Sequence, residues 1–174
     1  VNVLPENFFF DGRGSLAMSF ARLWSPKVNA IEFGGPCTER AAGPDMFIVD
    51  EKGLRRLKKA KEHYRKFVTE LMWSWRYAIE SDQIRGLTLD IILDAQPREW
   101  RKVAGDKIEI ETKREMRLRT GISPDLADMF ETGLEGARRR GFQIAKLSNP
   151  KADPKRGKDW LEKFAQDYEK MLNS

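Results

Sequence analysis

The sequence is poor in the residues that build disulfides and zinc sites. Among its 174 residues it has one cysteine, Cys37, and one histidine, His63. A disulfide framework is therefore impossible, and a zinc site made of Cys and His side chains is nearly so. Any metal ion would have to be held by carboxylates, which favour hard cations such as Mg²⁺ or Mn²⁺.

Long apolar runs are also missing. No stretch approaches the roughly 18 uninterrupted apolar residues of a membrane-spanning helix, so we expect no membrane partner. The phosphate-binding pattern G-x-x-x-x-G-K-[ST] does not occur, which excludes a P-loop ATPase motor within this chain. With 40% hydrophobic and 34% charged residues, the composition is that of a globular domain. The net charge of +5 agrees with a nucleic-acid partner without requiring one.

The first part of the chain predicts a βαβ unit. A short apolar run, Phe8 to Phe10, is followed by a glycine-rich turn, a helical pattern from Ser15 to Trp24 and a second apolar run from Val28 to Phe33. Such a unit places the two strands parallel. Asp11 ends the first strand, at the sheet edge where ligand sites form in open α/β folds. Capping of the next helix is an equally good interpretation of Asp11.

The middle of the chain predicts a loop from Gly34 to Glu51 and then one long helix. Apolar residues recur at helical spacing from Leu54 to Ile79. The other face of the first half is basic, and Arg55, Lys58 and Lys59 could follow a DNA backbone. A solvated surface is the more frequent role of such a face. Further short elements are expected as follows: helices at 87–93 and 97–103, a strand at 107–111, and a helical turn or two at 113–119.

A last helix of the domain is predicted to start at Ser123-Pro124-Asp125, with Ser as N-cap and Pro at the first helical position. Asp125 and Asp128 are three residues apart and lie on one side of it. The helix dipole explains Asp125 without a function, and explains Asp128 less well. Brought together with Asp11, they could hold two divalent ions for phosphodiester hydrolysis. A buried stripe is expected from Leu126, Met129, Phe130, Gly133, Leu134 and Ala137.

The order of these segments resembles the nuclease domain of the large subunit of tailed-phage terminases. Phe8 to Gly14 resembles that family's "strand, Asp, x, x, Gly" segment, and Trp73-Ser74-Trp75-Arg76 looks like the helix after its variable loop. The stretch from Lys107 to Lys113, followed by Ser123-Pro124-Asp125-Leu126-Ala127-Asp128, is similar to the closing motif. The resemblance extends over roughly residues 7 to 140.

This resemblance implies an α/β fold of the RNase H-like nuclease type, a central mixed sheet flanked by helices, here lacking its first strands. The partial nuclease domain would span residues 1–148, with a linker and helix at 149–174. Two Mg²⁺ or Mn²⁺ ions would be bound by Asp11, matching the family's second acid, and by Asp125, Asp128 or both, matching the last. Lys113 would match a basic position that could contact phosphate.

The implied activity is cleavage of double-stranded concatemeric phage DNA in the host cytoplasm, at the portal of the procapsid. An upstream ATPase domain, the portal and the small terminase subunit would be partners. Because the first acid would precede Val1, we expect this chain alone to be poorly active or inactive. Two alternatives stay open: a non-catalytic DNA-binding or portal-docking module that needs no metal, and another RNase H-like nuclease of the resolvase or transposase kind.

Overall fold

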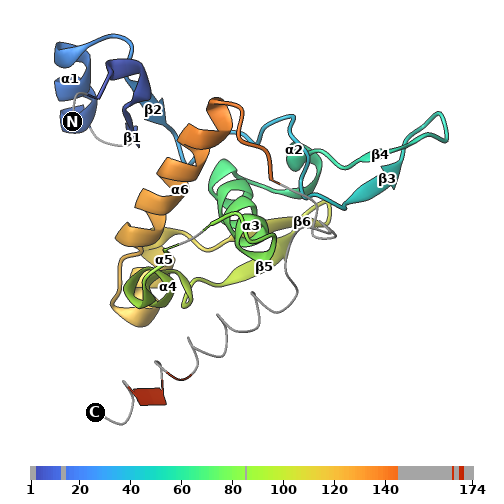
Figure 1. Ribbon diagram of the computed structural model, residues 1–174. Helices are drawn as coiled ribbons and strands as arrows, with labels where there is room; N and C mark the ends of the chain where they lie inside the picture. The colour runs from blue at the N-terminus through green and yellow to red at the C-terminus, as the bar shows by residue number, and fades with distance from the viewer. Residues whose placement is uncertain (1–2, 13–14, 85, 145–165, 167–168, 171–174) are drawn as a thin grey trace.

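The computed structural model describes residues 3–12, 15–84, 86–144, 166 and 169–170 (Figure 1). Apart from residues 166 and 169–170, the linker and helix predicted at 149–174 lie outside the described residues. None of the described helices is long and apolar enough to cross a membrane. The elements are η1 (Pro5–Asn7), β1 (Phe9–Asp11), α1 (Ser15–Trp24), β2 (Asn29–Ile31), β3 (Phe47–Val49), β4 (Arg55–Leu57), α2 (Ala60–His63), α3 (Phe67–Glu80), α4 (Leu89–Ala95), β5 (Trp100–Val103), β6 (Lys107–Ile110), α5 (Lys113–Thr120) and α6 (Asp125–Arg139).

The mixed α/β class is confirmed, and so is the predicted βαβ unit. Strands β1 and β2 are parallel, with Asp11 opposite Ile31. Strands β3 and β4 are antiparallel, as are β5 and β6. Among the described residues these pairs form three separate two-stranded sheets rather than one central mixed sheet.

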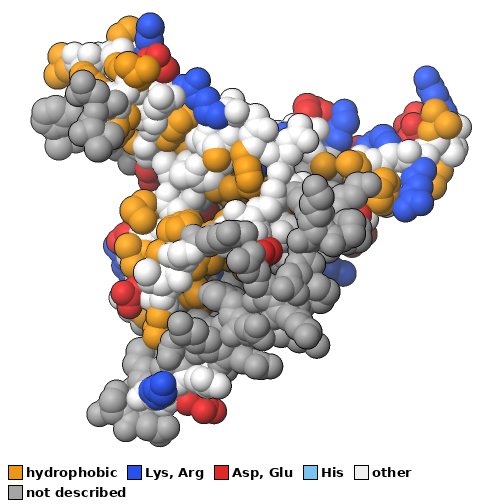
Figure 2. Space-filling model, in the orientation of Figure 1, with side chains coloured by type: hydrophobic (Ala, Val, Ile, Leu, Met, Phe, Trp, Pro, Cys, Tyr) orange, Lys and Arg blue, Asp and Glu red, His pale blue; other side chains and the backbone are white. Residues whose placement is uncertain are grey.

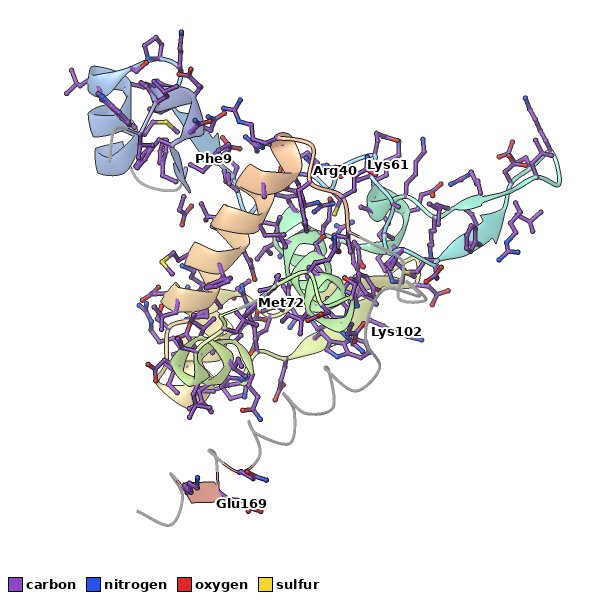
Figure 3. The ribbon with its side chains drawn as sticks, viewed as in Figure 1. Phe9, Arg40, Lys61, Met72, Lys102 and Glu169 are labelled. Atoms are coloured by element: carbon purple, nitrogen blue, oxygen red, sulfur yellow. The ribbon has the colours of Figure 1, made fainter. Side chains whose placement is uncertain are left out.

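Helix α3 joins the three hydrophobic clusters of the domain. Phe67 and Leu71 pack with β2, Trp73 packs with Tyr64, and Trp75 packs with α4 and α6. Figure 1 shows α6 lying alongside α3, with α4 and α5 near the first turns of α6. The βαβ unit packs on the later part of α6, where Phe9 fills the space left by Gly136 (Figure 3). Helix α6 therefore connects the βαβ unit to the rest of the domain.

The prediction of one helix from Leu54 to Ile79 is wrong in its first half. That half forms β4 and the short α2, and only α3 is a long helix. The predicted loop before it contains β3, which pairs with β4. The turn between them is set by Asp50, whose side chain accepts hydrogen bonds from the backbone N–H groups of Lys52 and Leu54, and by Gly53 at φ +75°. Such turn chemistry outweighs an apolar pattern that helical spacing also satisfies.

The helix predicted at 97–103 is likewise wrong, because Trp100–Val103 is strand β5. It pairs with β6 across a turn in which Gly105 and Asp106 both have positive φ values, +76° and +53°. These conformations favour Gly and Asp and close an antiparallel hairpin. The strand predicted at 107–111 and the helices predicted at 87–93 and 113–119 are confirmed, within one or two residues at their ends.

Candidate acidic site at the start of helix α6

The buried face of α6 carries carboxylates. Of the apolar stripe predicted on this helix, Leu134 is buried, but Leu126 and Met129 are exposed. The prediction of that stripe is therefore correct only for Leu134 and the half-buried Phe130, which pack in the core; Gly133 and Ala137 are exposed as well. The buried residues of α6 are Ala127, Asp128, Glu131, Leu134, Glu135 and Gly136. Burying a carboxylate is costly unless cations or hydrogen-bond donors compensate it, so these acids need partners from other elements.

The helix starts one residue later than expected. Pro124 occupies the N-cap position and gives no side-chain cap, while Asp125 is the first helical residue. The hydroxyl of Ser123 donates to Asp125 Oδ1 at 2.9 Å instead of capping the backbone. The cap comes from α4, where Asp94 Oδ2 accepts the backbone N–H of Ala127 at 2.9 Å. This tertiary cap fixes the start of α6 against α4.

Lys113 brings the predicted acids of the site together. Its Nζ forms an ion pair with Oδ2 of Asp128, and it lies 3.6 Å from Oδ1 of Asp125. Burial alone would lower the pKa of Lys113, but Asp128, Asp125 and the more distant charge of Asp11 together raise it above its ordinary value. All three acids predicted from the sequence therefore act on one ammonium ion, and the predicted basic residue lies among them.

A second cation, the buried guanidinium of Arg98, contacts the other carboxylate oxygen of Asp128. Nη1 of Arg98 lies 3.3 Å from Asp128 Oδ1 and 3.7 Å from Glu131 Oε1. The Arg98 side chain is only 2% exposed, and that of Glu131 is fully buried. Within the described part of the chain, neither carboxylate oxygen of Glu131 has a hydrogen-bond partner. Arg98 is therefore a fixed positive charge shared by two acids.

Burial dominates the electrostatics of these acids. It raises the pKa of Asp128, against the opposing effects of Lys113 and Arg98, and the negative charge of Asp11 adds to the rise. It also raises the pKa of Glu131 to about 8, because Arg98 compensates only part of the cost and Asp128 adds a repulsion. The two cations therefore offset only part of the cost of burying these two carboxylates.

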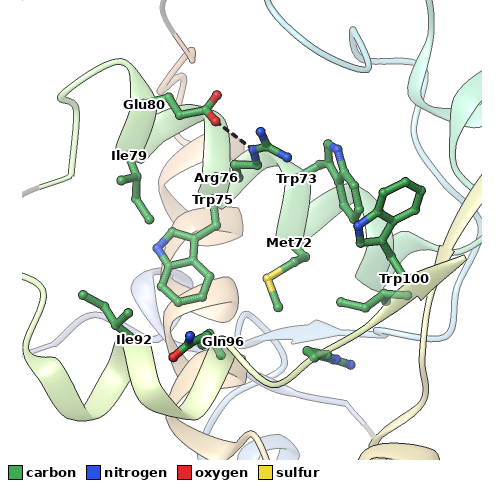
Figure 4. A pocket seen from close by; sticks show the side chains of 12 residues that line it. Met72, Trp73, Trp75, Arg76, Ile79, Glu80, Ile92, Gln96 and Trp100 are labelled. Carbon is green, nitrogen blue, oxygen red and sulfur yellow. Dashed lines mark hydrogen bonds and ion pairs between the residues drawn. The ribbon is translucent and has the colours of Figure 1, made fainter. Parts of the chain in front are cut away.

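An apolar pocket lies on the other side of Arg98. This pocket, of about 380 Å³, is bounded by α3, α4 and β5, and Arg98 is one of its lining residues. Figure 4 shows Trp73 and Trp100 meeting edge to face, with centroids 5.8 Å apart, and Met72 beside them. Arg98 therefore lies between this pocket and the acidic site.

The opposite end of α6 is also charged, but there the acids are fully paired. Glu135 accepts hydrogen bonds from Arg40 at 2.6 Å and 3.1 Å, and from Arg139 at 2.9 Å. Glu70 of α3 accepts from Thr38 and from Arg138. Figure 3 places Arg40 beside the last turns of α6. This network satisfies its own charges and explains its burial without a ligand.

The predicted DNA-contacting residues lie elsewhere. Arg55 is exposed on the β3–β4 hairpin, with its guanidinium 4.1 Å from the ring centre of Phe47. Lys58 follows β4 and is half-buried, whereas Lys59 pairs with Glu39 at 2.8 Å. The hairpin extends away from the first turn of α6, and its outer part carries basic, acidic and apolar side chains (Figures 1 and 2). These residues do not belong to the acidic site.

Sequence reasoning missed three residues around the site. Glu32 directly follows β2 and is exposed, and because β1 and β2 are parallel it leaves the sheet at the same edge as Asp11. The rule that singled out Asp11 applies equally to Glu32. Glu131 lies three residues after Asp128 on one helix face, a signal that was present in the spacing. Nothing in the sequence pointed to Arg98, which reaches the site only through the packing of α4 on α6.

Within the described residues, no group of three or more Cys, His, Asp or Glu side chains is arranged to hold a metal ion. The carboxylates nearest to such an arrangement surround Lys113 instead. Comparisons of this chain with models of protein families, with curated proteins and with solved structures found no match.

Proposed function

We propose that the chain is part of a metal-dependent DNA endonuclease of the phage terminase kind, with an RNase H-like nuclease fold. The observation that carries the proposal is the ion pairing of Lys113 with Asp125 and Asp128, to which Asp11, from a distant part of the sequence, adds its charge. The resemblance of the closing motif to the terminase family supports the same assignment. The substrate would be double-stranded DNA, cut during genome packaging.

The residues of the site fit hard divalent cations. Asp11, Asp125 and Asp128 offer only oxygen ligands, which suit Mg²⁺ and Mn²⁺. A cation, the Lys113 ammonium, already lies between two of them. Behind Asp128, the two carboxyl oxygens of Glu131 have no hydrogen-bond partner among the described residues. When bound, divalent ions would polarise the phosphodiester and activate the attacking water.

The chain's own residues would prepare that chemistry. Arg98, itself buried, fixes the orientation of Asp128 through one carboxylate oxygen. Asp94 anchors the first turn of α6, so that Asp125 and Asp128 keep their positions. The ammonium of Lys113 is at the mouth of the site, where a DNA phosphate would be held.

Two measurements test the proposal. Calorimetric titration with Mn²⁺ should show binding to the parent chain that is lost in an Asp11→Asn/Asp128→Asn double variant. Asp106→Asn is the matched control. Asp106 is an exposed residue of the β5–β6 turn that is not assigned to the site, and Asn tolerates its positive φ. No Mn²⁺ binding by the parent, or equal binding by the double variant, would refute the metal site.

In a polypeptide that cuts double-stranded DNA and contains this chain, Asp128→Asn should abolish Mn²⁺-dependent plasmid nicking and retain DNA binding. Unchanged nicking by that variant would show that the catalytic site lies elsewhere. A chain that binds DNA equally well with and without chelator, and never a metal, would favour the non-catalytic DNA-binding module.

A further inference from the structure

The carboxylates assigned to the metal already hold a cation that belongs to the chain. The ammonium of Lys113 pairs with Asp128, lies 3.6 Å from Asp125 and feels the charge of Asp11. Its side chain is 40% exposed. It can therefore leave the site toward solvent without opening a packed core.

The position of Lys113 on its helix favours such a departure. Lys113 is the first residue of α5, behind the N-cap Thr112, which forms a capping box with Glu115. Positive charge is disfavoured at a helix N-terminus by the helix dipole. The neighbouring carboxylates compensate for this cost. If another cation neutralises those carboxylates, both that cation and the N-terminus of α5 repel Lys113.

The charge balance of the site also identifies Lys113 as the cation that moves. Arg98 is 2% exposed and is held between Asp128 and Glu131, so it stays in place. Lys113 is the more exposed of the two cations. Replacing its single charge by a divalent ion brings a site with an excess of carboxylates closer to neutrality.

We propose that Lys113 is an internal counter-ion that occupies the position of a metal ion and swings out when a divalent cation binds. This inference rests on the proposed function, because it assumes that Asp125 and Asp128 ligate that cation. The displaced ammonium then lies at the rim of the site, where it can pair with a phosphate of the DNA. Lys113 would in this way couple loading of the metal to binding of the substrate.

Calorimetric titration of the 174-residue chain with Mn²⁺ tests the displacement. Lys113→Met removes the competing charge and keeps the aliphatic stem. It should lower the Kd for Mn²⁺ roughly tenfold, the scale of losing one partly buried ion pair. Lys66→Met is the matched control, since Lys66 is 38% exposed and pairs with the largely buried Glu109 at 2.7 Å. It should leave the Kd unchanged.

The outcomes separate this inference from the proposed function. Tighter Mn²⁺ binding by Lys113→Met than by the parent supports the inference. Mn²⁺ binding by the parent that is equal or weaker in Lys113→Met overturns the inference and leaves the metal site standing. No Mn²⁺ binding by the parent overturns the metal site, and the inference with it.

A second readout follows the lysine itself. If Mn²⁺ releases Lys113 into solvent, acylation of its amine, quantified by peptide mass spectrometry, should become severalfold faster on addition of Mn²⁺. Acylation of Lys66 in the same sample should not change. A Lys113 rate that stays constant or falls at saturating Mn²⁺ would show that the ammonium keeps its place, and would overturn the displacement.

Discussion

Replacing Glu131 by Gln should stabilise the protein at neutral and alkaline pH. Glu131 is fully buried in α6, and the guanidinium of Arg98 approaches it only to 3.7 Å. Its burial raises its pKa from 4.5 to about 8. Gln has the shape of the protonated acid and no charge to bury, so Glu131→Gln removes the cost of ionisation inside the protein.

Proton linkage gives the size and the sign of the effect. Because the pKa of Glu131 is raised in the folded state, its contribution to stability is fully present below pH 4.5 and is lost as the pH rises through 8. At 1.36 kcal/mol for each pH unit between these two pKa values, the loss reaches up to about 4 kcal/mol at pH 8. Glu131→Gln does not titrate. The variant and the parent should therefore be equally stable near pH 4.5, and the variant should gain on the parent toward pH 8.

Urea denaturation in the presence of a chelator, at pH 5 and at pH 8, measures this difference. Glu135→Gln is the matched control, because Glu135 is equally buried, one turn further along α6, but is hydrogen-bonded to Arg40 and Arg139. That variant should be less stable than the parent at both pH values. If Glu131→Gln is less stable than the parent at pH 8, Glu131 is ionised and stabilised by Arg98, and the reasoning is refuted.

Three further predictions concern other parts of the molecule. Gly136→Ala should lower the free energy of unfolding by about 1–3 kcal/mol, because the new Cβ would lie 2.8 Å from an aromatic ring of β1. Gly133→Ala has open space around it and should be neutral or stabilising by up to about 1 kcal/mol. Equal shifts of the melting temperature in the two variants would contradict this. Arg55→Ala and Lys58→Ala should each reduce the slope of log K for DNA against log salt by about 0.9 if the hairpin contacts phosphates, and an unchanged slope would exclude these contacts. Burial raises the pKa of Cys37 to about 11, so its alkylation at pH 8 should be on the order of a hundredfold slower than in the urea-denatured chain; equal rates, measured by mass spectrometry, would contradict the burial of the thiol.

The elements that could be predicted from the sequence are those with unambiguous local signals. A glycine-rich turn between two apolar runs defined the βαβ unit, and the alternating pattern of Lys107–Ile110 defined β6. The β3–β4 hairpin could not be found in this way, since Leu54 and Leu57 continue the apolar spacing of α3 but are exposed. The side chain of Asp50 and the left-handed Gly53 decide the turn there.

Of the acidic site, only three of its acids could be predicted from the sequence. Asp11, Asp125 and Asp128 could be selected from their positions at the ends of predicted elements. The buried face of α6 could not, because hydrophobic periodicity ignores a face built from carboxylates such as Glu131. Arg98 lies in a segment predicted as helix, and its contact with Asp128 depends on tertiary packing that no local pattern encodes.

The two ends of α6 indicate why function should be sought at only one of them. At the later end, Glu70 and Glu135 are met by Arg40, Arg138 and Arg139, so cations outnumber acids and each carboxylate has hydrogen-bond donors.

At the first turns the balance is reversed. There, Lys113 and Arg98 are the cations that pair with Asp125, Asp128 and Glu131, and the charge of Asp11 also acts on Asp128. A protein that only needed to bury this helix could have neutralised both ends alike. Because burying Asp128 and Glu131 is costly unless cations compensate it, and the more exposed Asp125 adds a further charge beside them, this end of α6 is the one that gains most from binding a divalent ion.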